Sequence, residues 1–350
     1  MKKLKTKLVV SFLLIAMTYF TNAQNISTPR VSQQATITQR LGLSDVTIVY
    51  HSPGVRGRQI FGGIVSTGNI WRAGANENTT IHFKHDATVE GKKIAAGTYG
   101  LFMIPGEDEF QILFSKYNQS WGTVSPAEDE LALQVSVKPE AIPFQEWLSY
   151  DFTDRGSNSL TAVLQWEKLR IPFKIEFDVD KIVIDNARAE LKGLAGFGWR
   201  GYMQAANYCL QNDTNLEEAM TWIDQSITNS KGFSNLQVKA GLLAKKGQVA
   251  EAMKIMEEAI PTGSPNQLNN YGYQLLGAGK TKEAIKVFTL NVEKNQDDPF
   301  IWGFIDSLGE AYLKDGNEKM ALKYYKLAKT KAPQNQHAYL DGVITGIEKQ

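Results

Sequence analysis

The chain has little cysteine, no excess of charge of either sign and, beyond its first 23 residues, no long apolar run. Its one cysteine, Cys209, excludes a disulfide within the chain and any Cys-x-x-Cys metal or redox motif. Lys and Arg number 38 against 37 Asp and Glu, so the chain lacks the basic excess typical of nucleic-acid-binding proteins. Its 350 residues, 43% of them hydrophobic, predict about two globular domains.

Residues 1–23 have the pattern of a secretory signal peptide. Lys2, Lys3, Lys5 and Lys7 form a basic start, Leu8–Phe20 is mostly apolar, and Thr21-Asn22-Ala23 suits signal peptidase. The apolar stretch is too short to cross about 30 Å of hydrocarbon comfortably, which disfavours the alternative of an uncleaved anchor. The sequence therefore predicts an exported protein, periplasmic or extracellular, with no membrane span after cleavage.

Residues 24–178 are expected to form an all-β domain. Apolar residues recur with period two in many short segments without intervening helical patterns, which favours an antiparallel β-sandwich or barrel. The expected strands are Ala35–Thr38, Val46–Tyr50, Thr80–Phe83, Thr98–Ile104, Phe110–Phe114, Leu131–Val137, Trp147–Phe152, Leu160–Trp166 and Ile171–Phe177. Turn residues stand between several of them, as at Glu90-Gly91-Lys92 and Arg155-Gly156-Ser157-Asn158.

The segment 52–78 is rich in glycine and contains no clear strand, so it is either a functional loop or a cover for the sandwich. This segment and its flank hold the candidate ligand-binding residues His51, Arg56, Arg58, Trp71, Arg72, Asn76 and Glu77. Arg58 and Arg72 suit a carboxylate or phosphate, Trp71 offers a stacking face, and Asn76 and Glu77 suit sugar hydroxyls. The alternative is structural: a buried network in which Arg72 pairs with Glu77 or Glu167.

Evidence for an enzyme is weak, and no catalytic residue is assigned. His82, His85 and Asp86 suggest a metal site, but residues i and i+3 of a strand point to opposite faces, so no metal site and no cofactor are predicted. No Gly-x-Ser-x-Gly motif or pair of catalytic carboxylates is evident. A metal-assisted hydrolase using His51, His82 and Glu77 stays as an alternative.

From residue 179 the period becomes helical. A linking helix and junction are expected over 179–199, and residues 200–350 contain four repeats followed by a C-terminal capping helix. Ala219, Ala252, Ala284 and Ala321 mark equivalent positions with spacings of 33, 32 and 37 residues. Gly247, Gly279 and Gly316 stand between the paired helices. Small residues are expected where the two helices of a pair cross closely.

Both halves resemble known families. The repeats carry small, aromatic, Ala, aromatic, Ala and Pro residues at the spacing of tetratricopeptide-repeat proteins, as in Leu308-Gly309, Tyr312, Ala321, Tyr325, Ala328 and Pro333. The N-terminal half resembles the bacterial family called domain of unknown function 2911. That resemblance rests on Gly57-Arg58-Gln-Ile-Phe61-Gly62, Trp71-Arg72-Ala-Gly-Ala-Asn76-Glu77, Ala96-Gly97-Thr98-Tyr99, Trp121-Gly122 and Leu164-Gln-Trp166-Glu167. It implies a β-rich fold and no established activity.

The tetratricopeptide resemblance implies a protein-binding groove lined by the first helix of each pair. The positions that it places there are Gln204, Tyr208, Gln237, Lys245, Asn269, Tyr273, Asp306, Glu310 and Lys314. Tyr208 and Tyr273 are the expected hot spots, because rigid amphipathic rings contribute large contact area at low entropic cost. A spacer or dimerisation role is the alternative.

The sequence thus favours an exported, non-enzymatic adaptor whose repeats bind a protein partner and whose β-domain binds a partner or a small polar ligand. A carbohydrate- or anion-binding module is the alternative of another class. No nucleic-acid partner is expected.

Overall fold

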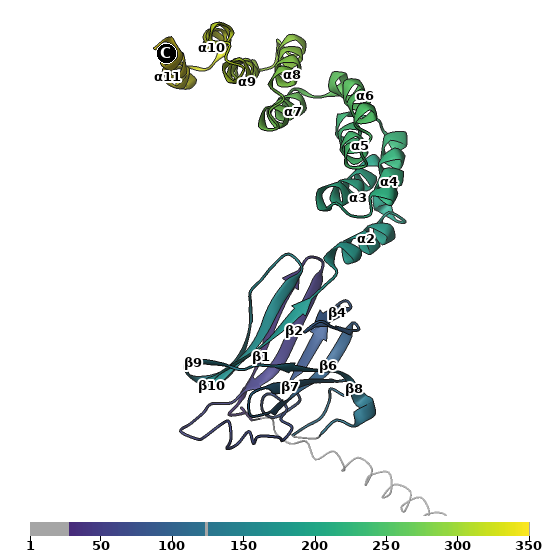
Figure 1. Cartoon of the computed structure of the whole chain (residues 1–350), viewed down its shortest axis with the longest axis vertical. Coiled ribbons are helices and arrows are strands. Elements are labelled where there is room, and N and C mark those ends of the chain that lie inside the picture. The colour runs from purple at the N-terminus through teal and green to yellow at the C-terminus, as the bar shows by residue number, and fades with distance from the viewer. Residues whose placement is uncertain (1–27, 123–124, 350) are drawn as a thin grey trace, which may run out of the picture. The chain divides into compact units, whose positions relative to one another are not determined.

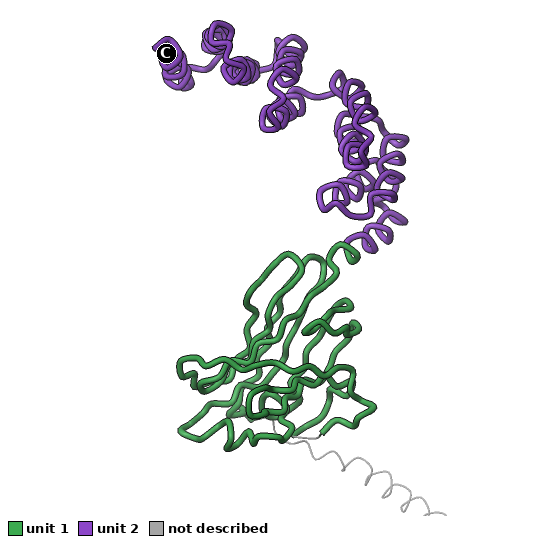
Figure 2. Tube along the Cα trace, in the orientation of Figure 1, with its two compact units in different colours: residues 1–182 green, residues 183–350 purple. Residues whose placement is uncertain are grey.

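The computed structural model of the chain describes residues 28–122 and 125–349 (Figure 1). The expected signal peptide, residues 1–23, lies outside the described residues. The chain divides into two compact units, residues 1–182 and residues 183–350 (Figure 2). The first is β-rich and the second is helical, which confirms the predicted fold class.

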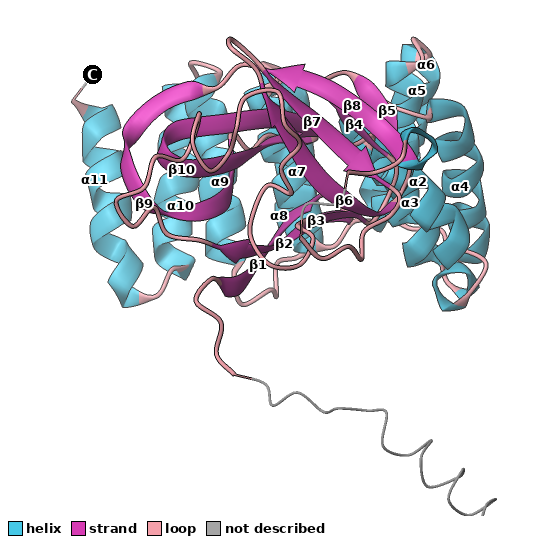
Figure 3. Cartoon of the chain, turned by 90° about the horizontal axis from the view of Figure 1, so that it is seen from below, coloured by secondary structure: helices cyan, strands magenta, loops and turns pink. Residues whose placement is uncertain are grey.

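The β-rich unit contains two antiparallel sheets. Six strands form one sheet in the order β1-β2-β3-β6-β7-β8, and four form the other in the order β5-β4-β10-β9 (Figure 3). The strands are β1 (Gln33–Leu41), β2 (Ser44–Ser52), β3 (Thr80–Phe83), β4 (Ala87–Val89), β5 (Lys92–Ile94), β6 (Gly97–Pro105), β7 (Phe110–Ser115), β8 (Leu131–Val137), β9 (Glu140–Thr153) and β10 (Ser159–Glu176). A short 3-10 helix, Glu128–Glu130, precedes β8.

The alternating sequence pattern places one set of side chains between the sheets. In β2, Val46, Ile48 and Tyr50 are buried while the residues between them are partly exposed. Phe114 of the first sheet packs against Phe173 of the second, with ring centroids 6.2 Å apart. Burying these large side chains supplies the main driving force for joining the sheets.

Two details of the strand prediction are wrong. Segments 160–166 and 171–177, expected to be separate strands, form the single strand β10. The pairing of β10 with β9 shifts on both sides of Glu167, whose φ of 54° lies in the left-handed region. Such a bulge absorbs the break in the alternation without ending the strand. The hairpin of β4 and β5 was not predicted as strands, because three residues are too few to show a period; its expected turn at Glu90-Gly91 is present.

The helical unit is built from helix pairs. Its helices are α3 (Trp199–Asn212) and α4 (Leu216–Asn229), α5 (Phe233–Lys245) and α6 (Val249–Ala259), α7 (Pro265–Gly277) and α8 (Thr281–Lys294), α9 (Ile301–Lys314) and α10 (Glu318–Lys331), then α11 (His337–Glu348). Before them, α2 (Val179–Glu190) includes the boundary between the units, and 3-10 helices cover Leu194–Phe197, Ile260–Thr262 and Gln334–Gln336. None of the helices in the described ranges is both long and apolar enough to cross a membrane.

Small residues set the contact between the helices of a pair. The four marker alanines are buried, with exposed fractions of 0% for Ala219, Ala284 and Ala321 and 6% for Ala252. At Gly272 of α7 a Cβ atom would lie 2.4 Å from the Phe288 ring of α8. Gly247, Gly279 and Gly316 adopt φ angles of 80°, 73° and 75° between paired helices, a region that favours glycine.

We expect Gly272→Ala to destabilise the helical unit by about 1–3 kcal/mol, because its methyl group would overlap the buried Phe288 ring. Urea unfolding followed by circular dichroism would measure the change. Gly277→Ala is the matched control in the same helix, since nothing lies within 4 Å of its Cβ position. That variant is expected to be neutral or stabilised by up to about 1 kcal/mol. Equal midpoints for the two variants would contradict the proposed close packing.

Candidate functional sites

The loop between β2 and β3 is fixed to both sheets along its length. Trp71 exchanges two backbone hydrogen bonds of 2.8 Å with Met103 of β6. The carbonyl of Ala73 accepts hydrogen bonds from the Thr79 hydroxyl at 3.1 Å and the Tyr150 hydroxyl at 2.9 Å. Because Tyr150 belongs to β9, these contacts join the loop to the second sheet as well.

Trp71 is a core residue, so the expectation that its face is available for a ligand is wrong. Trp71 is only 8% exposed. Its ring stacks on Trp166, with centroids 5.8 Å apart and an interplanar angle of 20°. The indole Nε1 donates to the carbonyl of Gly74 at 3.1 Å. A tryptophan beside charged residues suggested a binding surface. In the structure the apolar faces of the Trp71 ring pack in the core of the β-rich unit.

Arg56 and Arg58 contact the protein itself. Arg58 donates from Nε to the carbonyl of Val55 at 3.0 Å and from a terminal nitrogen to that of Gly54 at 2.7 Å, which closes its own turn. The exposed Arg56 guanidinium lies 5.8 Å from the centroid of the Trp147 ring. These contacts give both arginines structural roles.

His51, Glu77 and Arg72 come together beside a hollow of about 560 Å³. His51 is 7% exposed, and its Nε2 lies 3.2 Å from Glu77 Oε2. Arg30, which the sequence did not indicate because it lies 47 residues away, donates to the other oxygen of Glu77. The hollow is lined by Pro29, Arg30, Ser32, Gln33, Gln34, His51 and Glu77, and Asn76 donates to the Ser32 carbonyl at 3.1 Å.

Burial and neighbouring charges shift the pKa values of the groups around this hollow. The hydrogen bond from Arg30 lowers the pKa of Glu77, so its carboxylate stays ionised. Burial lowers the pKa of His51 more than the charge of Glu77 raises it, and the charges of Arg30 and Arg72 lower it further. Burial also lowers the pKa of Arg72. Glu77 therefore pairs with Arg30, and the charge of Arg72 acts on the His51 imidazole.

The structure does not bring His51 and His82 together. His82 of β3 pairs with Thr47 of β2, and His51 lies four residues further along β2, about 13 Å away at the rise of a strand. The His82 ring instead hydrogen-bonds Thr98 at 2.9 Å. Across residues 28–122 and 125–349, no three His, Cys, Asp or Glu side chains are placed to hold a metal ion. The metal set of the hydrolase alternative is thus not assembled.

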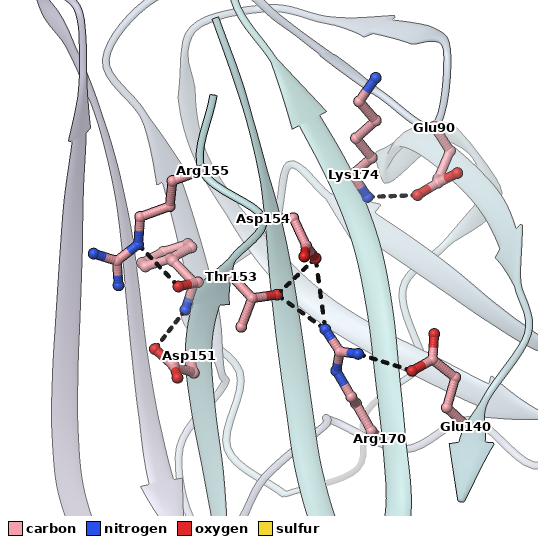
Figure 4. Close-up of polar contacts among 9 residues, drawn as sticks. Glu90, Glu140, Asp151, Thr153, Asp154, Arg155, Arg170 and Lys174 are labelled. Carbon is pink, nitrogen blue, oxygen red and sulfur yellow. Dashed lines mark hydrogen bonds and ion pairs between the residues drawn. The ribbon is translucent and has the colours of Figure 1, made fainter. Parts of the chain in front are cut away.

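A second charged network, not indicated by the sequence, joins β9 to β10 (Figure 4). Arg170 of β10 binds Glu140 at 2.8 Å, Thr153 at 2.9 Å and Asp154 at 3.6 Å. Arg170, Glu140 and Asp154 border a hollow of about 360 Å³. Because the Arg170 guanidinium is already bound by residues of the second sheet, the network's evident role is to hold its strands together.

In the helical unit, the first helices of successive pairs carry a connected row of polar side chains. We call the surface formed by α3, α5, α7 and α9 the A-helix face. Ser234 and Gln237 of α5 bond Gln267 and Gln274 of α7 at 2.9 and 3.0 Å. Since both contacts ascend together in the sequence, α5 and α7 run in the same direction. The Tyr273 hydroxyl continues the row to α9, 3.1 Å from Ser307 and 3.0 Å from Glu310.

The remaining predicted residues of this face divide into two groups. Gln204 and Lys314 are exposed, Tyr208 is half-buried, and Lys245 pairs with Asp213 at 3.2 Å, so these residues do not join one cluster. Asn269 and Asp306, by contrast, each lie one helical turn before Tyr273 and Glu310 on α7 and α9. Burial, followed by the charge of Asp306, raises the pKa of Tyr339 of α11, which places Tyr339 near this carboxylate. We call Asn269, Tyr273, Asp306, Glu310 and Tyr339 the Asp306 cluster.

The pKa values of Asp306 and Tyr273 in the Asp306 cluster are raised. Burial, followed by the charge of Glu310, raises the pKa of Asp306 from 3.8 to about 6. Burial raises the pKa of Tyr273 to about 12, so its hydroxyl remains a hydrogen-bond donor. The sequence did not indicate Ser307 or Tyr339 as site residues. Ser307 directly precedes Leu308-Gly309, which was assigned to helix packing, and Tyr339 lies in the expected capping helix.

Comparison with known families matches the N-terminal half of the chain. The family model described as "Protein of unknown function (DUF2911)" matches residues 32–175, which confirms the resemblance of the N-terminal half. No curated protein matches the chain. Among solved structures, Pseudomonas aeruginosa pilF is similar with 16% identity and a TM-score of 0.30, covering 43% of this chain and 67% of that chain.

Two further solved structures are described as tetratricopeptide-type proteins. YrrB, described as "a TPR protein with an unusual peptide-binding site", has 18% identity and a TM-score of 0.29, covering 46% of this chain and 82% of its own. A putative kinesin light chain from Podospora anserina with "TPR-like repeats" has 15% identity and a TM-score of 0.32. The match covers 45% of this chain and 87% of that chain.

We expect Asp306→Asn to stabilise the protein at pH 7.5. A carboxyl whose pKa is higher in the folded than in the unfolded state costs stability when it ionises, and this cost appears as the pH rises from about 4 to about 6. Allowing for its partial exposure, the cost is on the order of 1 kcal/mol. Thermal unfolding of parent and variant from pH 3.5 to 8 would measure it. If the stability difference between parent and variant did not shrink below pH 4, ionisation of Asp306 would not be its cause.

Proposed function

We propose that this protein is a non-enzymatic interaction protein whose A-helix face binds a segment of a protein partner. The observation that carries the proposal is the polar row from Ser234 and Gln237 through Tyr273 to Glu310. This row links α5, α7 and α9, the first helices of three successive pairs. Its side chains both donate and accept hydrogen bonds, as a peptide backbone does. A segment lying across the row would meet a similar set of groups on each helix.

Tyr273 is the expected anchor of this surface. It is 38% exposed, and its ring packs against Phe288 with centroids 5.3 Å apart. A ring already held by its neighbour loses little freedom when a partner covers it. The Tyr273 hydroxyl donates within the protein and can still accept a hydrogen bond from a partner. Tyr208 occupies the corresponding kind of position on α3 and is half-buried.

We also propose that the protein acts after export, in the periplasm or outside the cell. The basic start and the apolar stretch of residues 1–23 support this location. The intact mass of protein recovered from the cell envelope is expected to be that of a chain beginning at Gln24. Recovery of the full-length mass from the cytoplasm alone would contradict export.

We expect Tyr208→Ala together with Tyr273→Ala to abolish capture of a partner from envelope extract while leaving the fold intact. Removing two anchor rings of this kind costs about 2 kcal/mol or more of binding free energy each. Immobilised parent and variant would be compared by mass spectrometry of the retained proteins, with circular dichroism as the check on folding.

The matched control is Gln225→Ala together with Met253→Ala, which truncates two exposed side chains on the second helices α4 and α6. This control is expected to retain every protein that the parent retains. If the tyrosine variant kept the same proteins as the parent, or if the control lost them equally, binding through the A-helix face would be wrong.

A further inference from the structure

The Asp306 cluster carries negative charge that the described part of the chain does not neutralise. Within residues 28–122 and 125–349, no Lys, Arg or His side chain forms an ion pair with Asp306 or Glu310. Some acids of the helical unit are paired, as Asp224 is with Lys239 at 2.8 Å and Glu217 with Lys246 at 2.7 Å, while others such as Glu257 and Glu283 are exposed to solvent. The A-helix face therefore has one place where two adjacent carboxylates lack a cation.

The cluster also holds acceptor atoms without donors. Asp306 Oδ1 and Asn269 Oδ1 are buried and have no hydrogen-bond partner among the described residues. Both atoms accept hydrogen bonds, and in an ionised Asp306 either carboxylate oxygen is an acceptor. Leaving such buried acceptors without a donor is unfavourable. The group that would complete the cluster is therefore a hydrogen-bond donor, and beside two carboxylates a positively charged donor is favoured over a neutral one.

The aromatic members suit a long side chain that ends in a cation. Tyr273 is 38% exposed and Tyr339 is 52% exposed. The Tyr273 hydroxyl donates to Glu310, and the charge of Asp306 acts on Tyr339. Tyrosine rings attract cations, and they pack well against the methylene stem of Lys or Arg. A bare metal ion fits less well, because the described residues offer no group of three metal-binding side chains here.

We infer that the Asp306 cluster receives a lysine or arginine side chain of the partner segment bound on the A-helix face. This inference rests on the proposed function and adds the chemistry of one partner residue to it. It also gives the segment a fixed register, because the cation can be satisfied at one position along the polar row. An acidic segment is excluded from this end of the face by repulsion from both carboxylates.

The test uses a phage library displaying random 12-residue peptides, selected against the folded mature chain. Three targets are compared: the parent, Asp306→Asn with Glu310→Gln, and a control with the same charge change on exposed acids of α6 and α8, Glu257→Gln with Glu283→Gln. Peptides selected by the parent and by the control are expected to share Lys or Arg at one position. Peptides selected by the Asp306 and Glu310 variant are expected to lack that preference.

A selected peptide is then measured by calorimetry with its basic residue replaced by norleucine. The replacement is expected to weaken binding to the parent roughly tenfold or more and to the double variant less than twofold, because the coupling needs both charges. Asp306→Asn is expected not to destabilise the fold, so loss of binding in the variant cannot be ascribed to unfolding.

The outcomes separate this inference from the proposed function. Peptides that bind the parent through Tyr208 and Tyr273 but show no shared basic residue would overturn the inference and leave the function standing. A parent that selects no peptide above the Tyr208 and Tyr273 double variant would overturn both. An acidic residue shared at the same position would also contradict the inference.

Discussion

The close contact between the two helices of each pair is the constraint on which the helical unit depends. It requires a small residue where the helices cross, and Ala219, Ala284 and Ala321 are completely buried for that reason. Gly272 shows how little space remains, because even a methyl group there would meet the Phe288 ring. Fixing this contact fixes which side of every first helix is left for solvent, and hence which side chains form the A-helix face.

The β-rich unit solves a different problem, the attachment of a long loop to two sheets. Stacking of Trp71 on Trp166 buries the middle of the loop, and the Ala73 carbonyl is held by hydroxyls from two directions. Once the loop is fixed, its charged end is placed over β2. His51 is then covered and kept neutral by burial, while the Glu77 charge is balanced by Arg30. The polar residues of the loop are largely used in holding it.

The Asp306 cluster differs from the ion pairs that both units contain. In the β-rich unit, Arg30 with Glu77 and Arg170 with Glu140 are internal pairs. On the A-helix face, Asp306 and Glu310 lie side by side without such a cation among the described residues, and burial penalises the ionised form of Asp306. Like charges kept together at a stability cost are more common at functional surfaces than at structural ones. This contrast favours the helical unit as the place where a partner is recognised.

The sequence by itself determined the order of a β-rich and a helical half, most of the strands and the helix pairing, because these follow from apolar periods of 2 and 3.6 and from turn residues such as Gly247. The resemblance to tetratricopeptide repeats also pointed to Tyr273, Asp306 and Glu310 as residues of one helix face. Only the tertiary structure decided that Trp71 is buried, that Arg30 reaches Glu77, and that His51 and His82 lie apart. Those relations join residues distant in the chain through packing and loop closure, which no local period encodes.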